Sequence, residues 1–566
     1  MPLYEKFVGR NRDDFATLED LQKNYKVTVG DDFNYSYDVV DVIAKETPDK
    51  LAMLWVSNEG EERRFTFEDL RRLSNQTANF LVHHGVKKGD CVMLVLKRGY
   101  QFWYTLLALH RVGAIAIPAT HLLTAKDYVY RANAATVKMM IITGDGDPTD
   151  HVNEAMPECT SVETYCVTKH KDAGEKWLDF DALVARESEE FARPTGEAAN
   201  KSSDPMLMFF TSGTTGYPKM VWHDFTYPLG HILTGCFWHR VVDGGLHFTI
   251  SDTGWGKALW GKIYGQWLGG SAVFTYDFEK FHAEDILHKM EQYHVTTFCA
   301  PPTMYRYMIK EDLSKYDLSS LQHCTTAGEA LNPEVYNQWL RQTGHKIFEG
   351  FGQTETTLCC LTAFPWMQPR LGSMGLPAPG WRLVICDAND EEVPAGVTGE
   401  ICVRTDGGKP FGLFGGYFRD EALTKKAWHD DLYHTGDTAY KDELGFLWYV
   451  GRVDDVIKSS GYRIGPFEVE SALMEHPSVL ECAVTGVPDP DRGFVVKATI
   501  VLARGYEGTP ELTKELQNHV KKVTAPYKYP RIVEYVDELP KTISGKIRRV
   551  EIRKNDLEKH KADKPK

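Results

Sequence analysis

The sequence predicts an α/β protein with a large N-terminal region and a small α+β domain at its C-terminal end. In the first 200 residues, helical patterns alternate with short apolar runs such as 91–96 (CVMLVL) and 139–143 (MMIIT), which are typical of buried parallel strands. This alternation favours an α/β architecture. After Gly451 the pattern changes to a compact unit of about 110 residues, a common size for one domain.

The other elements follow from the same kind of pattern. Further strands are expected at 206–210, 272–276, 297–300 and 401–403, where apolar runs stand between Gly and Pro residues. The C-terminal unit is expected to contain a helix that begins at Pro466, a helix at 510–523, and strands at 481–487, 494–502 and 531–536.

Charge and composition exclude several classes of partner. The chain is 42% hydrophobic and 25% charged, as in an ordinary globular protein, and its 79 acidic and 65 basic residues give a net charge of −14. A molecule of this charge repels nucleic-acid backbones and anionic membranes, so no nucleic-acid partner is expected. Small anions remain possible ligands, because a local group of basic side chains and backbone N–H groups binds phosphate regardless of net charge.

Cysteine usage and the N-terminal segment predict a cytoplasmic protein. The eleven cysteines contain no CxxC pair and only one adjacent pair, Cys359 and Cys360, which fits neither a disulfide framework nor a zinc ribbon. The N-terminal segment carries charges where a signal peptide is apolar, and no integral membrane segment is expected, since no run of about 18 apolar residues occurs. The oligomeric state is not indicated.

The most informative segment is TSGTTGYPK at 211–219. It follows an expected strand and offers hydroxyls, glycines and a terminal lysine, which together suit phosphate oxygens; these residues are Thr211, Ser212, Gly213, Thr214, Thr215, Gly216 and Lys219. A surface turn is the alternative. The segment lacks the Walker A pattern, so reaction at the α-phosphate of a nucleotide remains open.

This string resembles the signature loop of the adenylate-forming superfamily, which includes acyl-CoA synthetases, luciferases and adenylation domains of peptide synthetases. Further segments resemble the same family in the same order: AGEALNP (327–333), EGFGQTET (349–356), YHTGD (433–437), GRVDDVIKSSGYRIGPFEVE (451–470) and PKTISGKIRR (540–549). The resemblance covers roughly residues 60–550. It implies a multi-subdomain acyl-adenylating domain over 1–453, a hinge over 454–456 with Asp454 as its pivot, and a mobile C-terminal domain over 457–566. A plain solvated linker is the alternative at Asp454.

Residue types within these motifs suggest how a nucleotide would be bound. Glu355 offers a hard carboxylate oxygen that suits Mg²⁺ bridging ATP phosphates, or else faces a helix N-terminus. Phe351 offers a flat face for adenine, although most family members have Tyr there. Asp437 can accept hydrogen bonds from two ribose hydroxyls, or serve as a turn residue. The resemblance places Arg452 near the ribose or α-phosphate. It also assigns Thr354 and Glu355 to the catalytic set. The further nucleotide-binding positions that it implies are Gly328, Glu329, Glu349, Gly350, Gly352, Gln353 and Thr354.

The resemblance also assigns a catalytic lysine and a coenzyme A passage. Lys546 would reach both the carboxylate substrate and the α-phosphate; a surface basic run with Lys541, Arg548 and Arg549 is the alternative, and only its position in the motif selects Lys546. The pantetheine arm of CoA would enter past Ser460, Gly461, Tyr462 and Arg463, and Arg492 and Lys521 match further CoA-contacting positions.

The acid itself is indicated less directly. The strings ISDTGW (250–255), EVESALMEHP (468–477) and TAPYKYPR (524–531) resemble the medium-chain acyl-CoA synthetase branch. Trp238, Trp255 and Trp260 are bulky enough to shorten a pocket, which would favour short, medium, branched or aryl acids. Each is equally compatible with a place in the core.

These observations together predict an ATP-dependent acid:CoA ligase that uses ATP, Mg²⁺ and CoA. The carboxylate would attack the α-phosphate to give acyl-AMP and pyrophosphate, and the CoA thiol would then displace AMP. One alternative is transfer of the acyl group to a separate carrier-protein thiol. Another is a nucleotide sensor without catalysis, against which the joint presence of Glu355, Asp437, Arg452 and Lys546 argues.

Overall fold

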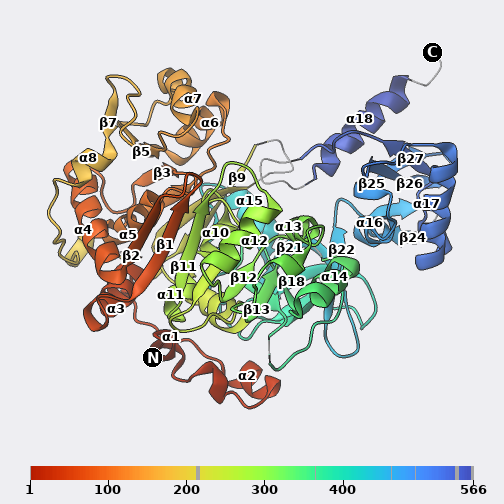
Figure 1. Cartoon of the computed structure of the whole chain (residues 1–566), viewed down its shortest axis with the longest axis horizontal. Coiled ribbons are helices and arrows are strands. Elements are labelled where there is room, and N and C mark those ends of the chain that lie inside the picture. Colours follow the sequence, from red (N-terminus) through yellow and green to blue (C-terminus); the bar gives the residue numbers. More distant parts are fainter. Residues whose placement is uncertain are drawn as a thin grey trace.

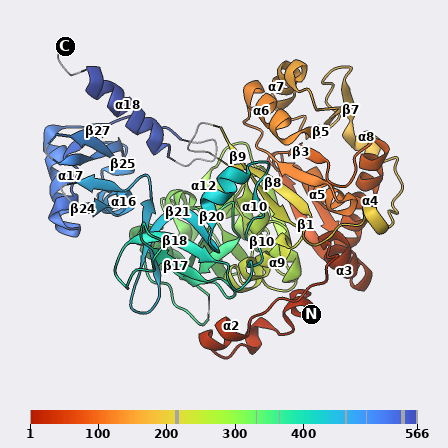
Figure 2. The same ribbon diagram turned by 180° about the vertical axis from the view of Figure 1, so that it is seen from behind.

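The computed structural model describes residues 2–211, 217–329, 331–363, 365–459, 462–490, 492–541 and 547–562. It confirms the predicted α/β class, with a large N-terminal domain and a small C-terminal domain (Figures 1 and 2). The strands of the described residues form three sheets, two in the large domain and one in the small domain.

The first sheet contains the largest number of strands. In spatial order these are β17 (Leu383–Cys386), β18 (Gly399–Arg404), β21 (Leu432–Lys441), β22 (Leu447–Arg452), β16 (Ser373–Pro377), β15 (Leu358–Leu361), β14 (Ile347–Gly352), β13 (His323–Thr326), β12 (Thr297–Cys299), β10 (Leu246–Thr249), β11 (Ala272–Asp277), β1 (Leu51–Ser57) and β2 (Glu62–Thr66), and β20 (Trp428–His429) pairs with β21.

Strand β14 marks a change of direction in this sheet. The strands β1, β11, β10, β12, β13 and β14 pair in parallel, whereas β14 pairs with β15 in antiparallel fashion and the antiparallel pattern continues to β17. The parallel strands are almost entirely buried, as expected for a sheet covered on both faces. The motif EGFGQTET begins in β14, so it lies at the point where the two halves of the sheet meet.

The second sheet carries the expected strands of the first 200 residues. Its order is β19 (Gly416–Tyr417), β9 (Lys219–Asp224), β8 (Pro205–Thr211), β4 (Ile115–Pro118), β3 (Cys91–Val95), β5 (Val137–Ile142), β6 (Thr164–Val167) and β7 (Trp177–Asp179). Strands β8 and β9 are antiparallel, and the segment TSGTTGYPK connects them.

Helices pack around the two large sheets. They are α1 (Tyr4–Val8), α2 (Leu18–Asn24), α3 (Asp41–Glu46), α4 (Phe67–His83), α5 (Gln101–Val112), α6 (Ala125–Ala135), α7 (Pro148–Ala155), α8 (Phe180–Val184), α9 (Tyr227–Ile232), α10 (Gly256–Gly261), α11 (Tyr264–Leu268), α12 (Ala283–Gln292), α13 (Pro302–Met308), α14 (Pro333–Thr343) and α15 (Glu421–Ala427). Helix α4 begins with a capping box, in which Thr66 and Asp69 satisfy each other's backbone N–H groups. No helix among the described residues is long and apolar enough to cross a bilayer.

The small domain has its own core and sheet. It contains β23 (Ile457–Ser459), β24 (Tyr462–Ile464), α16 (Pro466–Met474), β25 (Val479–Asp489), β26 (Gly493–Leu502), α17 (Pro510–Val523), β27 (Ile532–Tyr535) and α18 (Arg549–Ala562). Its elements match the predicted helices and strands, and α17 has the predicted bounds. The domain lies beside β22 of the first sheet (Figure 1), and only a turn separates Arg452 from Ile457, where the hinge is predicted.

Candidate active site

The predicted phosphate loop connects strands β8 and β9, which form an antiparallel hairpin. Thr211 at the end of β8 pairs with Lys219 at the start of β9, so the loop is held at its base by the strand ladder. The five loop residues Ser212, Gly213, Thr214, Thr215 and Gly216 lie outside the described residues. Thr211 and Lys219 are therefore the predicted phosphate-binding residues of this motif whose surroundings are defined.

Lys219 and Glu355 come together at Tyr417. The Lys219 Nζ lies 3.6 Å from Oε1 of Glu355 and donates a hydrogen bond of 3.1 Å to the Tyr417 hydroxyl. The same hydroxyl donates to Glu355 Oε1 at 3.0 Å. Burial, together with the Glu355 carboxylate, raises the pKa of Tyr417, so this hydroxyl stays a donor. Within the described structure both contacts are made to Oε1, which leaves Oε2 for a cation.

A second group of contacts surrounds Asp437. Its buried carboxylate accepts hydrogen bonds from the Gln353 Nε2 and, at 3.2 Å, from the Tyr449 hydroxyl, and lies 3.4 Å from Nη1 of Arg452. Asp437 and Arg452 are register partners in β21 and β22. The sheet thus fixes a carboxylate and a guanidinium side by side, as recognition of a ribose and its phosphate requires.

Gly436 is needed for this arrangement. Its φ is +71°, and a Cβ there would lie 2.7 Å from Nη2 of Arg452. A side chain at this position would therefore both strain the backbone and displace the guanidinium.

The backbone between these two groups is tied to the second sheet. The buried His223 of β9 donates from Nε2 to the Thr354 carbonyl at 2.7 Å, and burial lowers the pKa of His223 to about 4, so it is a neutral imidazole. The Phe351 ring is half-buried and lies 6.5 Å from the Tyr449 ring. Thr354 and Phe351 thus border the Asp437 group.

Glu349 faces away from these groups. Its carboxyl is buried and accepts the backbone N–H of Leu331 at 2.9 Å, and burial raises its pKa to about 8. The Glu349 carboxyl therefore links the EGFGQTET segment to the AGEALNP segment. A contact between residue 349 and a nucleotide would come from its backbone. In the first of these segments, Gly328 has a φ of +106° and the exposed Glu329 accepts a hydrogen bond from Thr303.

Two tryptophans pack on the glycines of β14. Trp238 is fully buried, and its Nε1 donates to the carbonyls of Phe348 and Glu349. A Cβ on Gly350 would lie 2.9 Å from its ring, and a Cβ on Gly352 would lie 2.5 Å from the ring of Trp260. The surroundings of Trp238 are those of a core residue, which is the alternative that the sequence left open.

Trp255 has a different environment from the two other tryptophans. It is half-buried and caps the N-terminal end of α10, next to Gly254, whose own neighbours are Ala119 and Thr120. Of the three tryptophans it therefore keeps the most side-chain surface for contact with a substrate.

The predicted CoA positions lie in the small domain. Ser459 pairs with Gly493, the residue that follows Arg492, whereas Ser460 and Gly461 lie outside the described residues. Tyr462 is 51% exposed and stacks on Tyr527 with ring centroids 4.1 Å apart, while Lys521 places its Nζ 4.0 Å from the centroid of the Tyr529 ring. The backbone of Arg463 belongs to β24.

The small domain contacts the large domain through polar groups near the hinge. The Asp454 carboxylate lies 3.7 Å from Arg452, and Asp455 is paired with Arg553 of α18. The Asn332 amide donates to the carbonyl of Ser471 at 3.4 Å. Lys546 lies outside the described residues, so its predicted role stays a prediction.

Three residues that contact these groups lie outside the sequence motifs: Tyr417, Tyr449 and His223. Tyr417 reaches Lys219 because β19 pairs with β9, and Tyr449 reaches Asp437 because β22 pairs with β21. No spacing of residues in the sequence predicts these strand pairings. Tyr433, which donates to Gln353 at 3.0 Å, lies inside the YHTGD motif, and that motif was the signal for it.

Comparison with known proteins agrees with this arrangement. Residues 40–418 match the model of the AMP-binding enzyme family, and residues 468–546 match its C-terminal domain. The chain is 40% identical over 551 residues to human acyl-coenzyme A synthetase ACSM3, mitochondrial, covering 96% of this chain and 93% of the relative. It is 42% identical over 533 residues to human acyl-coenzyme A synthetase ACSM5, mitochondrial, with coverage of 93% and 90%.

Solved structures show the same fold. The anthranilate CoA ligase AuaEII in complex with anthranoyl-AMP has a TM-score of 0.85 at 27% identity, with 94% of this chain and 99% of that chain covered. The acyl-CoA synthetase of Brucella canis has a TM-score of 0.72 at 32% identity, with coverage of 96% and 99%. The chain belongs to the AMP-binding enzyme family.

Proposed function

We propose that the protein is an ATP-dependent acyl-CoA synthetase that converts a carboxylic acid to its CoA thioester through an acyl-AMP intermediate. The proposal rests on the contact between Lys219, at the end of the phosphate-loop motif, and Glu355, in the EGFGQTET segment. The relatives named as acyl-coenzyme A synthetases support the same reaction.

The first step would be attack of the substrate carboxylate on the α-phosphate of ATP. Asp437 and Arg452 would hold the ribose, and Lys219 would contact the phosphates. Glu355 fits Mg²⁺, because its carboxylate offers hard oxygen ligands, is nearly buried, and is anchored through one oxygen only. Magnesium would supply charge neutralisation of the phosphates. Lys546 would stabilise the charge that develops during the attack.

In the second step, the CoA thiol would attack the acyl carbonyl, and AMP would leave. Carboxylate oxygen is a poor leaving group, whereas AMP is a good one, so no Ser or Cys nucleophile is needed. The thiol would arrive past Gly461 and Tyr462, and Arg492 and Lys521 would contact the phosphates of CoA.

The acid is proposed to be of short or medium chain length, branched or aryl. The resemblance of the segments 250–255, 468–477 and 524–531 to the medium-chain branch and the bulk of Trp255 and Trp260 support this range, and the similar anthranilate CoA ligase acts on an aryl acid. The cytoplasmic location predicted from the sequence remains a proposal, and the relatives quoted above carry the word mitochondrial in their names. Fractionation of cells that produce the full chain would test it.

The direct test is exchange of labelled pyrophosphate into ATP in the presence of a panel of carboxylic acids. We expect exchange that depends on the acid and is strongest for medium-chain or aryl members. A nucleotide sensor would bind ATP without exchange. An enzyme that loads a carrier protein would exchange but would form no thioester with free CoA.

A further inference from the structure

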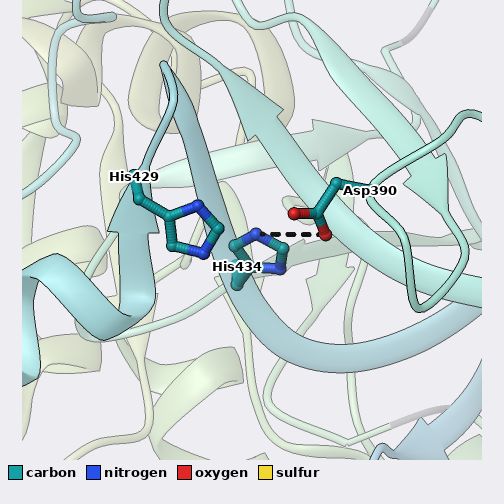
Figure 3. Close-up of side chains that lie close together, drawn as sticks. All are labelled: Asp390, His429 and His434. Carbon is teal, nitrogen blue, oxygen red and sulfur yellow. Dashed lines mark ion pairs between the residues drawn. The ribbon is translucent and has the colours of Figure 1, made fainter.

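A cluster of metal-ligating side chains lies on the antiparallel part of the first sheet, outside the groups described above. It contains His429 of β20, His434 of β21, and Asp390 from the turn that joins β17 to β18 (Figure 3). One ligand atom of each residue lies within 4.8 Å of the ligand atoms of the other two. The three side chains thus come close together from three segments of the chain.

The distances suit a single ion between the side chains. The Nε2 of His434 lies 3.6 Å from Oδ1 of Asp390. Ligands about 2.1 Å from a tetrahedral zinc ion are separated by roughly 3.4 Å. The His429 ring stacks on the His434 ring with centroids 4.8 Å apart, and its Nδ1 lies 3.3 Å from Oδ2 of Asp430. Its side chain is 39% exposed, so it has room for the rotation that would direct a ring nitrogen at the ion.

One ring nitrogen of His434 also lacks a hydrogen bond to the described residues. Its Nε2 atom is buried and makes no hydrogen bond to any described residue. A buried ring nitrogen without a partner costs free energy, which a bound cation would recover. The residue is itself only 16% exposed.

The opposite side of the His434 ring is arranged as in metal sites. Oε2 of Glu400 lies 3.3 Å from Nδ1, and Sγ of Cys402 lies 3.6 Å from the same atom. Histidines that bind metals commonly direct the second ring nitrogen at a carboxylate, which fixes the tautomer and orients the ring. Glu400 is in this position relative to Nε2 as the ligand atom.

We propose that Asp390, His429 and His434 bind a divalent transition-metal ion of the zinc class. Two imidazole nitrogens and one carboxylate oxygen favour Zn²⁺ or Co²⁺ over Mg²⁺ and Ca²⁺, which prefer oxygen ligands. Three protein ligands leave a fourth position open to water. This site is separate from the magnesium site proposed at Glu355.

The ion would connect the turn of Asp390 to strand β21, which carries the proposed ribose ligand Asp437. Glu400 accepts the backbone N–H of Gly436 at 2.7 Å through Oε1, while its Oε2 faces His434. Gly436 lies between His434 and Asp437. The bound ion would therefore hold the turn of Asp390 against the strand that carries Asp437.

The test is a titration of the full chain, freed of metal by a chelator and without nucleotide, with Zn²⁺ in a calorimeter. We expect one site that His429→Ala and Asp390→Asn each weaken by 10-fold to 100-fold or more, and that Glu400→Gln weakens by about 10-fold to 100-fold. Asp390 has a φ of +64°, which Asn tolerates, so that variant should keep the fold. Co²⁺ in place of Zn²⁺ should give visible absorption bands that these variants lose.

Matched controls separate this site from other binding. His170, Asp179 and Asp181 form another cluster with close ligand atoms, and His170→Ala should leave the titration unchanged. Glu355→Gln should also leave it unchanged. Equal Zn²⁺ affinity and stoichiometry in the wild type, His429→Ala and Asp390→Asn would overturn the proposal, and the interpretation of His434 as a structural ion pair with Glu400 and Asp390 would stand in its place.

Discussion

The ammonium group of Lys219, in the second sheet, lies 3.6 Å from the carboxylate of Glu355, in the segment between two strands of the first sheet. Lys219 begins β9 of the second sheet, and Glu355 follows β14 of the first. The Tyr417 hydroxyl contacts both side chains. This contact links the predicted phosphate loop to the predicted magnesium ligand.

Glu355→Gln should reduce acid-dependent pyrophosphate exchange by about 100-fold, because the variant keeps an acceptor for Tyr417 but loses the anion that would bind Mg²⁺. The exchange rate as a function of Mg²⁺ concentration measures this. Tyr417→Phe is the control, since it removes one hydrogen bond and retains the charge; it should lower the rate by less than about 10-fold. A Glu355→Gln enzyme that exchanges within a few-fold of the wild type would remove Glu355 from the proposed metal site.

Lys546→Ala should suppress formation of acyl-AMP and spare the reaction of CoA with supplied acyl-AMP. The family motif places this charge at the first transition state, and loss of one preorganised charge there costs on the order of 100-fold or more. Each half-reaction is measured separately on the same preparation. An equal loss in both would contradict the division of labour between the two steps.

Much of the fold could be predicted because it depends on local patterns. Helix α17 begins and ends where its apolar periodicity does, and the strand at 206–210 lies inside β8. The site could be predicted only as far as its motifs reach. The position of Tyr417 depends on the pairing of β19 with β9, and the Asp390 cluster depends on the β17–β18 turn meeting β20. Such long-range pairings are properties of the assembled sheets and leave no spacing in the sequence.

Trp255→Gly should raise kcat/KM for a longer straight-chain acid relative to a short one. One buried methylene contributes roughly 1 kcal/mol, so space for three or four shifts the preference by tens to hundreds of fold. Chain-length profiles and thermal unfolding are measured on the same variant. Trp339→Phe, in a separate core cluster, is the control and should leave the profile unchanged. An unchanged profile in Trp255→Gly with a large drop in melting temperature would identify Trp255 as a core residue.

Stability should fall as the pH rises from 7 to 8.5, in part because of Glu349. Burial raises the pKa of this carboxyl to about 8, so the folded protein keeps a proton that the unfolded chain loses near its usual value of 4.5. Within this window the folded state binds more protons, and raising the pH therefore favours unfolding, by at most about 1.4 kcal/mol per pH unit. Buried histidines such as His223, whose pKa is lowered to about 4, change charge at lower pH.

Glu349→Gln isolates this contribution. The variant keeps a neutral polar group that can accept the Leu331 N–H, so its unfolding free energy should depend less on pH than that of the wild type over the same window. Urea unfolding at pH 7 and at 8.5 measures the difference. Parallel pH dependence in the two proteins would show that Glu349 does not titrate as its burial implies.

The proposed reaction cleaves ATP at the α-phosphate and passes the acyl group to free CoA. The most direct measurement is chromatographic analysis of a reaction that contains the purified full chain, a medium-chain acid, MgATP and CoA. We predict AMP and an acyl-CoA thioester in equal amounts, with release of pyrophosphate and dependence on the acid. Formation of ADP and phosphate, or of AMP without a thioester, would contradict it.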